Sequence, residues 1–310
     1  MKNYVKIARP DHWIKNLFIM PGVAIALLLT EFELDDINII KLIIAFFATC
    51  MIASANYVIN EWLDAPFDKF HPTKKNRPVV TANMKFSIVM AEYVGLIAAG
   101  VLLSLLVNIP FLLTSLVLLI MGVLYNVKPI RTKDIAYFDV ISESVNNMLR
   151  LMMGWFVITD ASVPPSSILI GYWMAGAFLM ATKRFAEYRM IGDPEVAGLY
   201  RRSFKNYTEK TLLTSALFYA LISTFCLGVF LIKYRIEYLL CMPLLFLLFS
   251  YYIGMALDPD SAVQRPEKLF KEKHLMFLVL IIIVVFGIFT FVNIDSLHVL
   301  TTKALVGLNF

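Results

Sequence analysis

Long apolar stretches alternate with short polar segments along almost the whole chain. They lie near residues 17–30, 37–59, 87–107, 109–125, 137–158, 166–182, 211–232, 236–257 and 274–293. Most are long enough to cross about 30 Å of hydrocarbon as a helix, which takes roughly 20 residues. The first is marginal unless it begins near Pro10. Because backbone in contact with lipid must satisfy its own hydrogen bonds, the pattern predicts an all-α bundle of nine transmembrane helices that forms one membrane-embedded domain, residues 1–310.

The composition agrees with a polytopic membrane protein. The chain has 310 residues, of which 59% are hydrophobic, and a mean hydropathy of +0.73, which is outside the range of ordinary soluble domains. The N-terminal "MKNYVKIARPDHWIKN" is basic and aromatic without an early apolar core, so no cleavable signal peptide is expected. Cys50, Cys226 and Cys241 lie in apolar runs without ligand spacing, which predicts buried thiols rather than disulfides or metal ligands.

Positive charge gathers on one side of the predicted membrane. With nine spans, the N-terminus and every second loop carry 23 of the 28 Lys and Arg residues. Four others fall on the opposite side: Lys41, Lys233, Arg235 and Lys303. The last, Arg150, falls inside a span. The positive-inside rule then places the N-terminus and the basic loops in the cytoplasm, as expected for a multi-pass protein of the inner membrane. Eight spans, with 87–125 broken at Asn108 and Pro110, would disrupt this alternation.

One charged segment, residues 60–78 ("NEWLDAPFDKFHPTKKNRP"), directly follows an apolar stretch. Asn60, Asp64 and Asp68 are spaced four apart and would share one face of a continuous helix. Pro66 disfavours helix at the preceding residue, so the helix is expected to end near Asp64, with Asp68 in the following turn. Mg²⁺ is usually held by one or two carboxylates plus substrate phosphates. The segment therefore predicts a metal–diphosphate site. A solvated loop with internal ion pairs is the competing interpretation.

The same segment resembles the aspartate-rich signature of the UbiA superfamily of intramembrane prenyltransferases, which reads close to N-D-x-x-D-x-x-x-D-x-x-H-P-x-K-x-x-R-P. Glu61 departs from that pattern but keeps a carboxylate, and Pro66 is a second departure. The resemblance implies a nine-helix bundle with an active-site cavity on the cytoplasmic side. It implies a set of metal ligands, Asn60, Asp64 and Asp68. Lys74 and Arg77 are then expected to hold phosphate groups of the substrate.

Six further segments resemble one branch of that superfamily, the decaprenyl-phosphate phosphoribosyltransferases. They are "RPDHWIKNLFIMP" (9–21), "YNVKPI" (125–130), "LRLMMG" (149–154), "KRFAE" (183–187), "YRRSFKNYT" (200–208) and "RPEKLF" (265–270). Aromatic-prenylating relatives usually carry a second D-x-x-x-D cluster after the sixth span. Here the nearest acids are Glu187 and Asp193, with a different spacing. The branch implies phosphoribosyl pyrophosphate as donor, a polyprenyl phosphate as acceptor, and a requirement for Mg²⁺.

The resemblance and the charge pattern together assign further residues. The expected catalytic residues are Asp64, Asp68 and Arg150. The expected substrate-binding residues, besides Asn60, Lys74 and Arg77, are Arg9, Lys15, Lys128, Arg131, Lys183, Arg184 and Glu187. A charge inside a span is costly and usually faces a cavity or a partner, which is why Arg150 is singled out. Structural pairing of Arg150 with Glu143, or of Lys183 with Glu187 four residues later, is the competing explanation.

Two other functions stay open at this stage. A UbiA-type prenyltransferase would use the same metal site to move a prenyl group from a prenyl diphosphate to an aromatic or other small acceptor. A non-catalytic transporter or lipid-binding protein is expected to show paired charges or broken helices at mid-membrane, whereas charge here is concentrated on one face. No nucleic-acid partner is expected. The sequence leaves open the prenyl chain length, another phosphorylated sugar donor and the oligomeric state.

Overall fold

The computed structural model of the protein is a bundle of helices, and it describes residues 2–30, 38–71, 74–258, 261–264, 269 and 271–301. The longer helices are α2 (Met20–Leu29), α3 (Ile39–Asp68), α5 (Phe86–Leu105), α6 (Ile109–Asn126), α7 (Phe138–Ile158), α8 (Ser166–Ile191), α10 (Glu209–Tyr234), α11 (Met242–Leu257) and α12 (Lys273–Phe291). The short helices are α1 (Lys2–Ile7), η1 (Pro10–Ile19), η3 (Lys74–Asn76), α4 (Pro78–Thr81), η4 (Thr132–Asp134), α9 (Pro194–Tyr200), η5 (Arg202–Asn206), η6 (Ile236–Cys241), η7 (Ala262–Gln264) and η9 (Asp295–Thr301). Within these ranges no strand occurs, and the all-α prediction is confirmed there.

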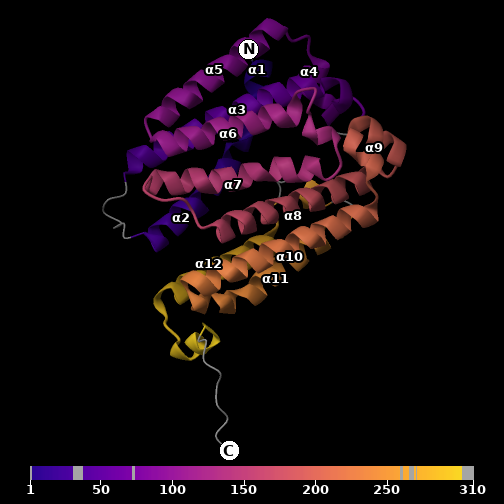
Figure 1. The fold of residues 1–310 in the computed structure, drawn as a ribbon. Coiled ribbons are helices and arrows are strands. Elements are labelled where there is room, and N and C mark those ends of the chain that lie inside the picture. Colours follow the sequence, from indigo (N-terminus) through magenta and orange to yellow (C-terminus); the bar gives the residue numbers. More distant parts are fainter. Residues whose placement is uncertain are drawn as a thin grey trace, which may run out of the picture.

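The long helices run side by side, with α7 and α8 in the middle of the bundle (Figure 1). Helices α3, α5 and α6 pack on one side of this central pair, and α10, α11 and α12 pack on the other. The short helix α9 lies at one end of the bundle, beside the last turns of α8. Segments that follow α3, α6 and α8 therefore meet at the same end.

Seven helical segments of the described chain are long and apolar enough to cross a membrane. They are Lys2–Leu29, Ile39–Asp68, Phe86–Leu105, Ile109–Asn126, Glu209–Tyr234, Ile236–Leu257 and Lys273–Phe291. The other two predicted spans form helices as expected, α7 and α8, but these carry more polar side chains. Central helices tolerate such residues because they face the bundle interior rather than lipid. The protein thus has the character of a multi-pass membrane protein, and the count of nine spans stays a prediction.

The region 87–125 forms two separate helices. Ser104 near the end of α5 lies 3.1 Å, Oγ to Oγ, from Ser115 near the start of α6, so the helices turn back on each other. The Asn108 side chain caps α6 by accepting a hydrogen bond from the Phe111 amide at 2.9 Å. Pro110 occupies the first turn, where its missing N–H is not needed. The region 87–125 therefore contains two separate candidate spans rather than one span with a break at Asn108 and Pro110.

The end of α3 differs from the prediction. The helix continues past Pro66 to Asp68, so the expectation that it ends near Asp64 was wrong. A proline removes one hydrogen bond and crowds the carbonyl four residues earlier. Here it lies in the last turn of a 30-residue helix, where few backbone bonds remain to be lost. As a result Asn60, Asp64 and Asp68 lie on one continuous helix at intervals of four.

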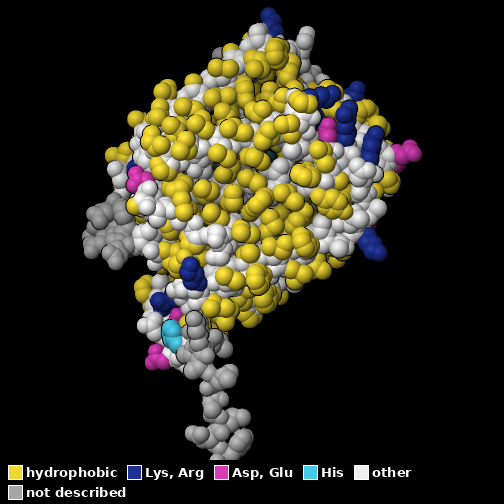
Figure 2. Space-filling model, viewed as in Figure 1, with side chains coloured by type: hydrophobic (Ala, Val, Ile, Leu, Met, Phe, Trp, Pro, Cys, Tyr) yellow, Lys and Arg dark blue, Asp and Glu magenta, His cyan; other side chains and the backbone are white. Residues whose placement is uncertain are grey.

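The surface separates apolar from charged regions. Figure 2 shows a broad hydrophobic face over the sides of the helices, with Lys and Arg gathered mainly at the end where α9 lies. Many large apolar side chains are well exposed, among them Phe225 of α10 and Phe277 of α12, at 71% and 64%. Exposed apolar surface of this extent suits contact with lipid rather than with water. The cysteines are free thiols: Cys50 and Cys241 are buried as predicted, whereas Cys226 is half-buried.

Two glycines bring α2 and the segment before it against α7. A Cβ atom on Gly22 would overlap the Leu151 carbonyl oxygen, and one on Gly154 would overlap that of Ile19. No side chain fits at either place. The two backbones are therefore in direct contact, which fixes the depth of η1 and α2 relative to α7.

Candidate active site

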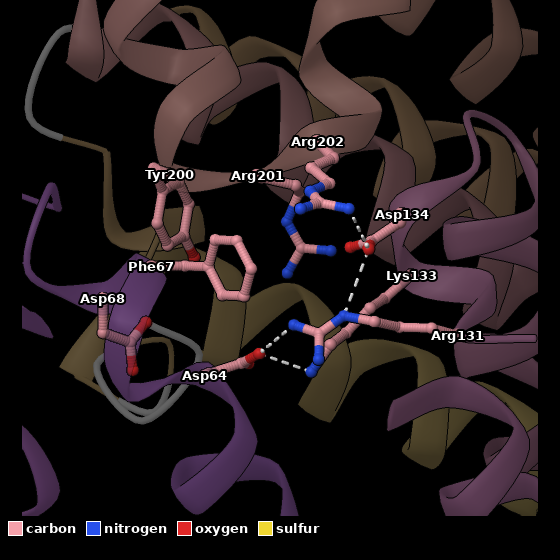
Figure 3. A pocket seen from close by; sticks show the side chains of 9 residues that line it. All are labelled: Asp64, Phe67, Asp68, Arg131, Lys133, Asp134, Tyr200, Arg201 and Arg202. Carbon is pink, nitrogen blue, oxygen red and sulfur yellow. Dashed lines mark hydrogen bonds and ion pairs between the residues drawn. The ribbon is translucent and has the colours of Figure 1, made fainter. Parts of the chain in front are cut away.

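A small pocket lies where the end of α3 meets the segments that follow α6 and α8 (Figure 3). Its lining residues are Asp64, Phe67, Asp68, Arg131, Lys133, Asp134, Tyr200, Arg201 and Arg202. The two carboxylates from α3 stand on one wall. Basic side chains from the η4 region and from the junction of α9 and η5 face them. Three parts of the chain that are distant in sequence thus build one polar pocket.

The acidic wall is already paired with cations. Asp64 accepts hydrogen bonds from Arg131 Nη2 at 3.0 Å and from Lys133 Nζ. Asp68 accepts one from Arg77 Nη1 at 2.6 Å. Hydrogen bonds between charged groups are the stronger kind. The two carboxylates are therefore held in place by cations that come from other segments of the chain.

The η4 segment carries its bases into the protein. Arg131 adopts a left-handed backbone conformation with φ of 33°, and both Arg131 and Lys133 are buried, at 6% and 3% exposure. Lys133 Nζ also donates to Asn126 Oδ1 at 2.7 Å, and Asn60 donates to the same oxygen. Burial lowers the pKa of Lys133 to about 8, against the opposing effect of Asp64. The ion pair with Asp64 keeps this buried ammonium charged near neutral pH.

The third wall is the turn from α9 into η5. Asp139, at the start of α7, is fully buried and accepts hydrogen bonds from Ser203 Oγ at 3.0 Å and Tyr207 OH at 2.8 Å. Arg201 Nη1 lies 3.7 Å from the same carboxylate. Asp139 thus ties this turn to α7. The tie leaves the guanidinium of Arg201 directed into the pocket (Figure 3).

The loop after α3 is fastened to α8. Lys74 Nζ donates to Glu187 Oε1 at 2.7 Å and also contacts the hydroxyl of Tyr200. His71 Nε2 lies 3.4 Å from the same Glu187 oxygen. Burial lowers the pKa of Lys74, although Glu187 opposes that shift. Lys74 therefore stands beside the pocket, where it links two walls.

Arg184 and Glu187 lie behind the pocket rather than in its lining. Arg184 is 2% exposed and its guanidinium lies 2.7 Å from Glu143, 3.3 Å from Glu187 and 3.4 Å from Asp139. A buried cation with three carboxylate partners cross-links α7 and α8. Glu143 thus pairs with Arg184 and not with Arg150. Likewise Glu187 pairs with Lys74 and Arg184, and no ion pair between Lys183 and a carboxylate occurs among the described residues.

The N-terminal site candidates lie beyond the pocket lining. Arg9 Nε donates to Glu61 Oε1 at 2.6 Å, and that same oxygen lies 3.7 Å from Arg77 Nε. Lys15 Nζ lies 3.2 Å from His12 Nδ1. Deeper in the bundle, Arg150 Nε donates to Asn16 Oδ1 at 3.1 Å. The predicted residues therefore divide into a pocket group and a group on η1 and α7.

Lys128 departs from the other candidates. It is exposed, and it precedes the η4 segment without reaching into the pocket. Asn60 also falls outside the lining, because its amide nitrogen is bonded to Asn126. The "RPEKLF" segment lies outside the described residues except for Leu269.

The donor set of the pocket fits a hard divalent cation bound together with a substrate. Asp64 and Asp68 offer carboxylate oxygens from successive turns of one helix. Within the described residues no group of three His, Cys, Asp or Glu side chains could hold a metal alone. Two carboxylates with the remaining positions left to water and phosphate is the usual arrangement for Mg²⁺. The residues present therefore suit Mg²⁺ rather than a closed structural metal site.

Several pocket residues were missed from the sequence. Lys133, Arg201 and Arg202 line the pocket, but the charge pattern marks them only as loop residues that define the topology. The signal available for them is their position: they lie in the same basic loops as Arg131 and in the quoted segment "YRRSFKNYT". Glu61 stands out in the sequence only as a departure from a motif, yet it is buried and holds both Arg9 and Arg77.

Comparisons with known proteins identify the family of this chain. Residues 19–281 match the UbiA prenyltransferase family. A decaprenyl-phosphate phosphoribosyltransferase of Mycolicibacterium smegmatis is 27% identical over 216 residues, which cover 67% of this chain and 63% of the relative. The enzyme of the same name from Corynebacterium glutamicum is 29% identical over 222 residues, which cover 67% and 60%. The chain thus spans about three fifths of the length of these relatives.

A solved structure shares the fold. The structure of a UbiA homolog from Archaeoglobus fulgidus bound to DMAPP and Mg²⁺ superposes with a TM-score of 0.69, covering 94% of this chain and all of the other. The two sequences are 18% identical, so this likeness concerns the helical architecture alone.

Proposed function

The chain belongs to the UbiA prenyltransferase family, and on this premise we propose that it transfers the 5-phosphoribosyl group from phosphoribosyl pyrophosphate to a polyprenyl phosphate, with Mg²⁺ as cofactor. The relatives named decaprenyl-phosphate phosphoribosyltransferase support this assignment. We further propose that residues 1–310 act as one domain, and that the pocket faces the cytoplasm from the inner membrane. The gathering of Lys and Arg at the end where α9 lies supports this orientation (Figure 2).

One observation carries the proposal: four bases line the pocket together with three carboxylates, of which Asp64 and Asp68 come from α3 and Asp134 from η4. Asp64 and Asp68 stand opposite a set of cations, Arg131, Lys133, Arg201 and Arg202. A prenyl diphosphate has one charged group and a long apolar tail. Phosphoribosyl pyrophosphate has a diphosphate and a separate 5-phosphate on a polar sugar. A small polar pocket with cations on two walls matches the second kind of donor better.

The acids near α8 support the same choice. Glu187 is neutralised by Lys74 and Arg184. Asp193 caps α9 by accepting from the Glu195 and Val196 amides. Neither lines the pocket. Among the described residues, α8 and the turn after it therefore bring no carboxylate into the pocket, whereas a prenyl-diphosphate enzyme would be expected to offer a second metal-binding pair there.

Asp64 and Asp68 would hold Mg²⁺, and its charge would stabilise the negative charge that develops on the leaving diphosphate. The chain's own cations would bind the phosphate groups of the two substrates. Arg131 and Lys133, now on Asp64, would turn to the donor's phosphate oxygens, and Arg77 would do the same from Asp68. Lys74 and Arg201 stand where they can hold the second phosphate group. Arg9, Lys15 and Lys183 lie on the side from which a lipid phosphate would approach.

The reaction needs no general base in this scheme. A phosphate oxygen of the polyprenyl phosphate attacks C1 of the ribose. The bond from C1 to the diphosphate oxygen breaks, and its electron pair leaves with diphosphate. The product is polyprenyl-phosphoryl ribose 5-phosphate. Because both substrates are anions that repel each other, positioning and fixed positive charge are the main contributions of the protein.

Prenyl transfer to a small acceptor is the second candidate, because the structural neighbour from Archaeoglobus fulgidus was solved with DMAPP and Mg²⁺. A direct assay separates the two. Purified protein in liposomes receives labelled phosphoribosyl pyrophosphate, decaprenyl phosphate and Mg²⁺, and the label is sought in the lipid extract. A parallel reaction offers labelled geranyl diphosphate and 4-hydroxybenzoate. Lipid-extractable ribose label supports our proposal. Its absence, together with prenylation of the aromatic acid, would reverse the order of the candidates.

A further inference from the structure

Arg150 differs from the other arginines on this side of the bundle because it has no carboxylate partner among the described residues. Four others each have a carboxylate oxygen at 2.6–3.0 Å: Arg9, Arg77, Arg131 and Arg184. Arg150 instead donates from Nε to Asn16 Oδ1 at 3.1 Å and from Nη1 to the Asn146 carbonyl at 3.3 Å. Both of these acceptors are neutral.

This arrangement leaves a charge without compensation. A guanidinium stays protonated and offers five N–H groups, and two neutral oxygens satisfy only part of them. A charge inside a membrane span is costly unless it pairs or faces a polar cavity. An amide oxygen and a backbone carbonyl orient the group but do not neutralise it. The partner that would complete the arrangement is therefore an anion.

The guanidinium is held firmly in its place. Asn16 is 1% exposed, and its amide nitrogen donates to Cys50 Sγ at 3.2 Å, which turns its oxygen toward Arg150. The close contacts at Gly22 and Gly154 fix η1 and α2 against α7 directly after this bond along both segments. A bond that is braced by two backbone contacts is suited to orienting a binding group.

The surroundings show from which side an anion would arrive. Because Arg150 contacts the carbonyl four residues earlier, its side chain leans toward the start of α7, where Asp139 borders the pocket region. The Oδ1 atom of Asn146 is buried there without a hydrogen-bond donor, and a side-chain amide can rotate to present its nitrogen instead. Lys183 on α8, which interacts electrostatically with His12 on η1, adds a second positive charge on this side.

The place of Arg150 argues against the donor as the source of this anion. Arg150 lies on α7 outside the lining of the pocket that contains Asp64 and Asp68, and its side chain leans back toward the start of that helix. A water-soluble sugar phosphate has no apolar part that such a position would favour. A phosphate with an apolar chain does, because the chain can stay in the bundle or the lipid while the headgroup meets the cation.

We propose that Arg150 binds the phosphate of a prenyl monophosphate, and that Asn16 is a positioning residue that orients the guanidinium without neutralising it. The inference rests on the proposed function, since it names the subsite for the acceptor of that reaction. It also accounts for the choice of residue at position 16. An aspartate at position 16 would be nearly the same size, but its carboxylate would form an ion pair with Arg150 and neutralise the charge.

Direct binding of farnesyl phosphate tests the proposal without any turnover. The affinity of the purified full chain in nanodiscs is measured by microscale thermophoresis, with farnesol and inorganic phosphate as the two comparison ligands. The variants are Asn16→Asp, Arg150→Met and Arg150→Lys, with Arg189→Met as control. Arg189 is an arginine at the end of α8 that contacts the Leu257 carbonyl, away from the subsite. Thermal unfolding of each variant is recorded in parallel.

We expect wild type and Arg189→Met to bind farnesyl phosphate within about twofold of each other and at least about tenfold more tightly than farnesol or phosphate. Asn16→Asp should bind about tenfold or more weakly while its melting temperature is unchanged or higher. A purely structural asparagine would not give that combination. Arg150→Met should lose affinity by about tenfold or more and Arg150→Lys by less. If Arg150→Met does not fold, Asn16→Asp and Arg150→Lys carry the test.

Three outcomes would overturn the inference: equal binding of farnesol and farnesyl phosphate, tighter binding of inorganic phosphate, or wild-type affinity in both Asn16→Asp and Arg150→Met. The function itself is scored separately by phosphoribosyl transfer. A wild-type protein that binds farnesyl phosphate through Arg150 but transfers no phosphoribosyl group would retain the subsite and reject the function. Conversely, if the wild type transfers the phosphoribosyl group but Asn16→Asp and Arg150→Met bind farnesyl phosphate as tightly as it does, the function would be retained and the subsite rejected.

Discussion

The two ends of the bundle both carry clusters of charge, but they use it differently. At the end opposite the pocket, Arg235 Nε donates to the Phe289 carbonyl at 2.7 Å and Nη2 to the Val292 carbonyl at 3.1 Å. Glu237 there accepts from the Ile294 amide at 3.2 Å. These short contacts complete the backbone at the end of α12, where helices leave carbonyls without partners, whereas the ion pairs of Glu237 with Arg235 and His298 are long, at 3.9 and 3.8 Å.

At the pocket end, the bases contact carboxylates from other parts of the chain. Arg131 and Lys133 reach Asp64 across 67 and 69 residues of sequence, and Lys74 reaches Glu187 across 113. A charged side chain that is hydrogen-bonded to backbone groups cannot bind a ligand without leaving those groups unpaired. Charges that pair with one another can exchange partners when a charged ligand arrives. The identity of the partner, rather than the density of charge, distinguishes the site from a helix cap.

The largest difference between the two ends is expected from Asp64→Asn. The change removes a proposed metal ligand and leaves Arg131 and Lys133 without their shared carboxylate. Phosphoribosyl transfer should fall by about 10²–10³-fold, the loss typical of removing one main electrostatic contact. Steady-state assays with varied Mg²⁺ measure this. Glu237→Gln, at the other end, is the matched control and should keep activity within about twofold. Similar losses in both variants would contradict the comparison.

A smaller loss is expected from Lys133→Met. The variant removes one charge-assisted contact to the donor and keeps the apolar part of the side chain. Such a contact is worth about 1.5–3 kcal/mol, which corresponds to roughly a tenfold to hundredfold loss in kcat/KM. The KM for phosphoribosyl pyrophosphate should rise more than that for the lipid. An unchanged donor KM would show that Lys133 serves only to hold Asp64.

The contact between α2 and α7 gives a stability prediction. Gly154→Ala places a methyl group against the Ile19 carbonyl, and relief of that clash requires the helices to separate. Overpacking of this kind costs about 1–3 kcal/mol, so the melting temperature in detergent should fall by several degrees. A Cβ atom on Gly287, in α12, would meet nothing within 4 Å among the described residues. Gly287→Ala should therefore leave the melting temperature unchanged or raise it.

The smallest effect is expected from Lys128→Met. Lys128 was assigned to substrate binding from the sequence, but it is exposed and outside the pocket lining. Exposed charges contribute little, so donor and acceptor kinetics should stay within about twofold of wild type. A tenfold loss in kcat/KM would restore Lys128 to the binding site and require the loop before η4 to approach the substrate.

The sequence predicted the helices better than it predicted their partners. Hydrophobic runs place α5, α6 and α12 to within about two residues, because the membrane imposes both length and composition on such helices. The end of α3 was misplaced because Pro66 was expected to end the helix before it, whereas it lies in the last turn and the helix continues to Asp68. Pattern and spacing describe what a segment prefers, not what surrounds it.

The candidate site shows the same division. Asp64, Asp68, Arg77 and Arg131 were found because they fall in a dense motif or a basic loop. The buried pairing of Arg184 with Glu143 could not be found, since the two residues belong to different helices and share no local pattern. The same holds for Arg201, which becomes part of the pocket only because Asp139 ties η5 to α7. Contacts of this kind follow from the tertiary arrangement.

The pairing inside the pocket also bears on how quickly a donor is captured. Each of the four bases that line it lies within 4.0 Å of a carboxylate, and three carboxylates belong to the lining, so the net positive charge of the lining is small. Long-range attraction, which salt weakens and which accelerates many charged encounters, has little to act on. The association rate of phosphoribosyl pyrophosphate should then vary only weakly with ionic strength, because it is set by how often these internal pairs open.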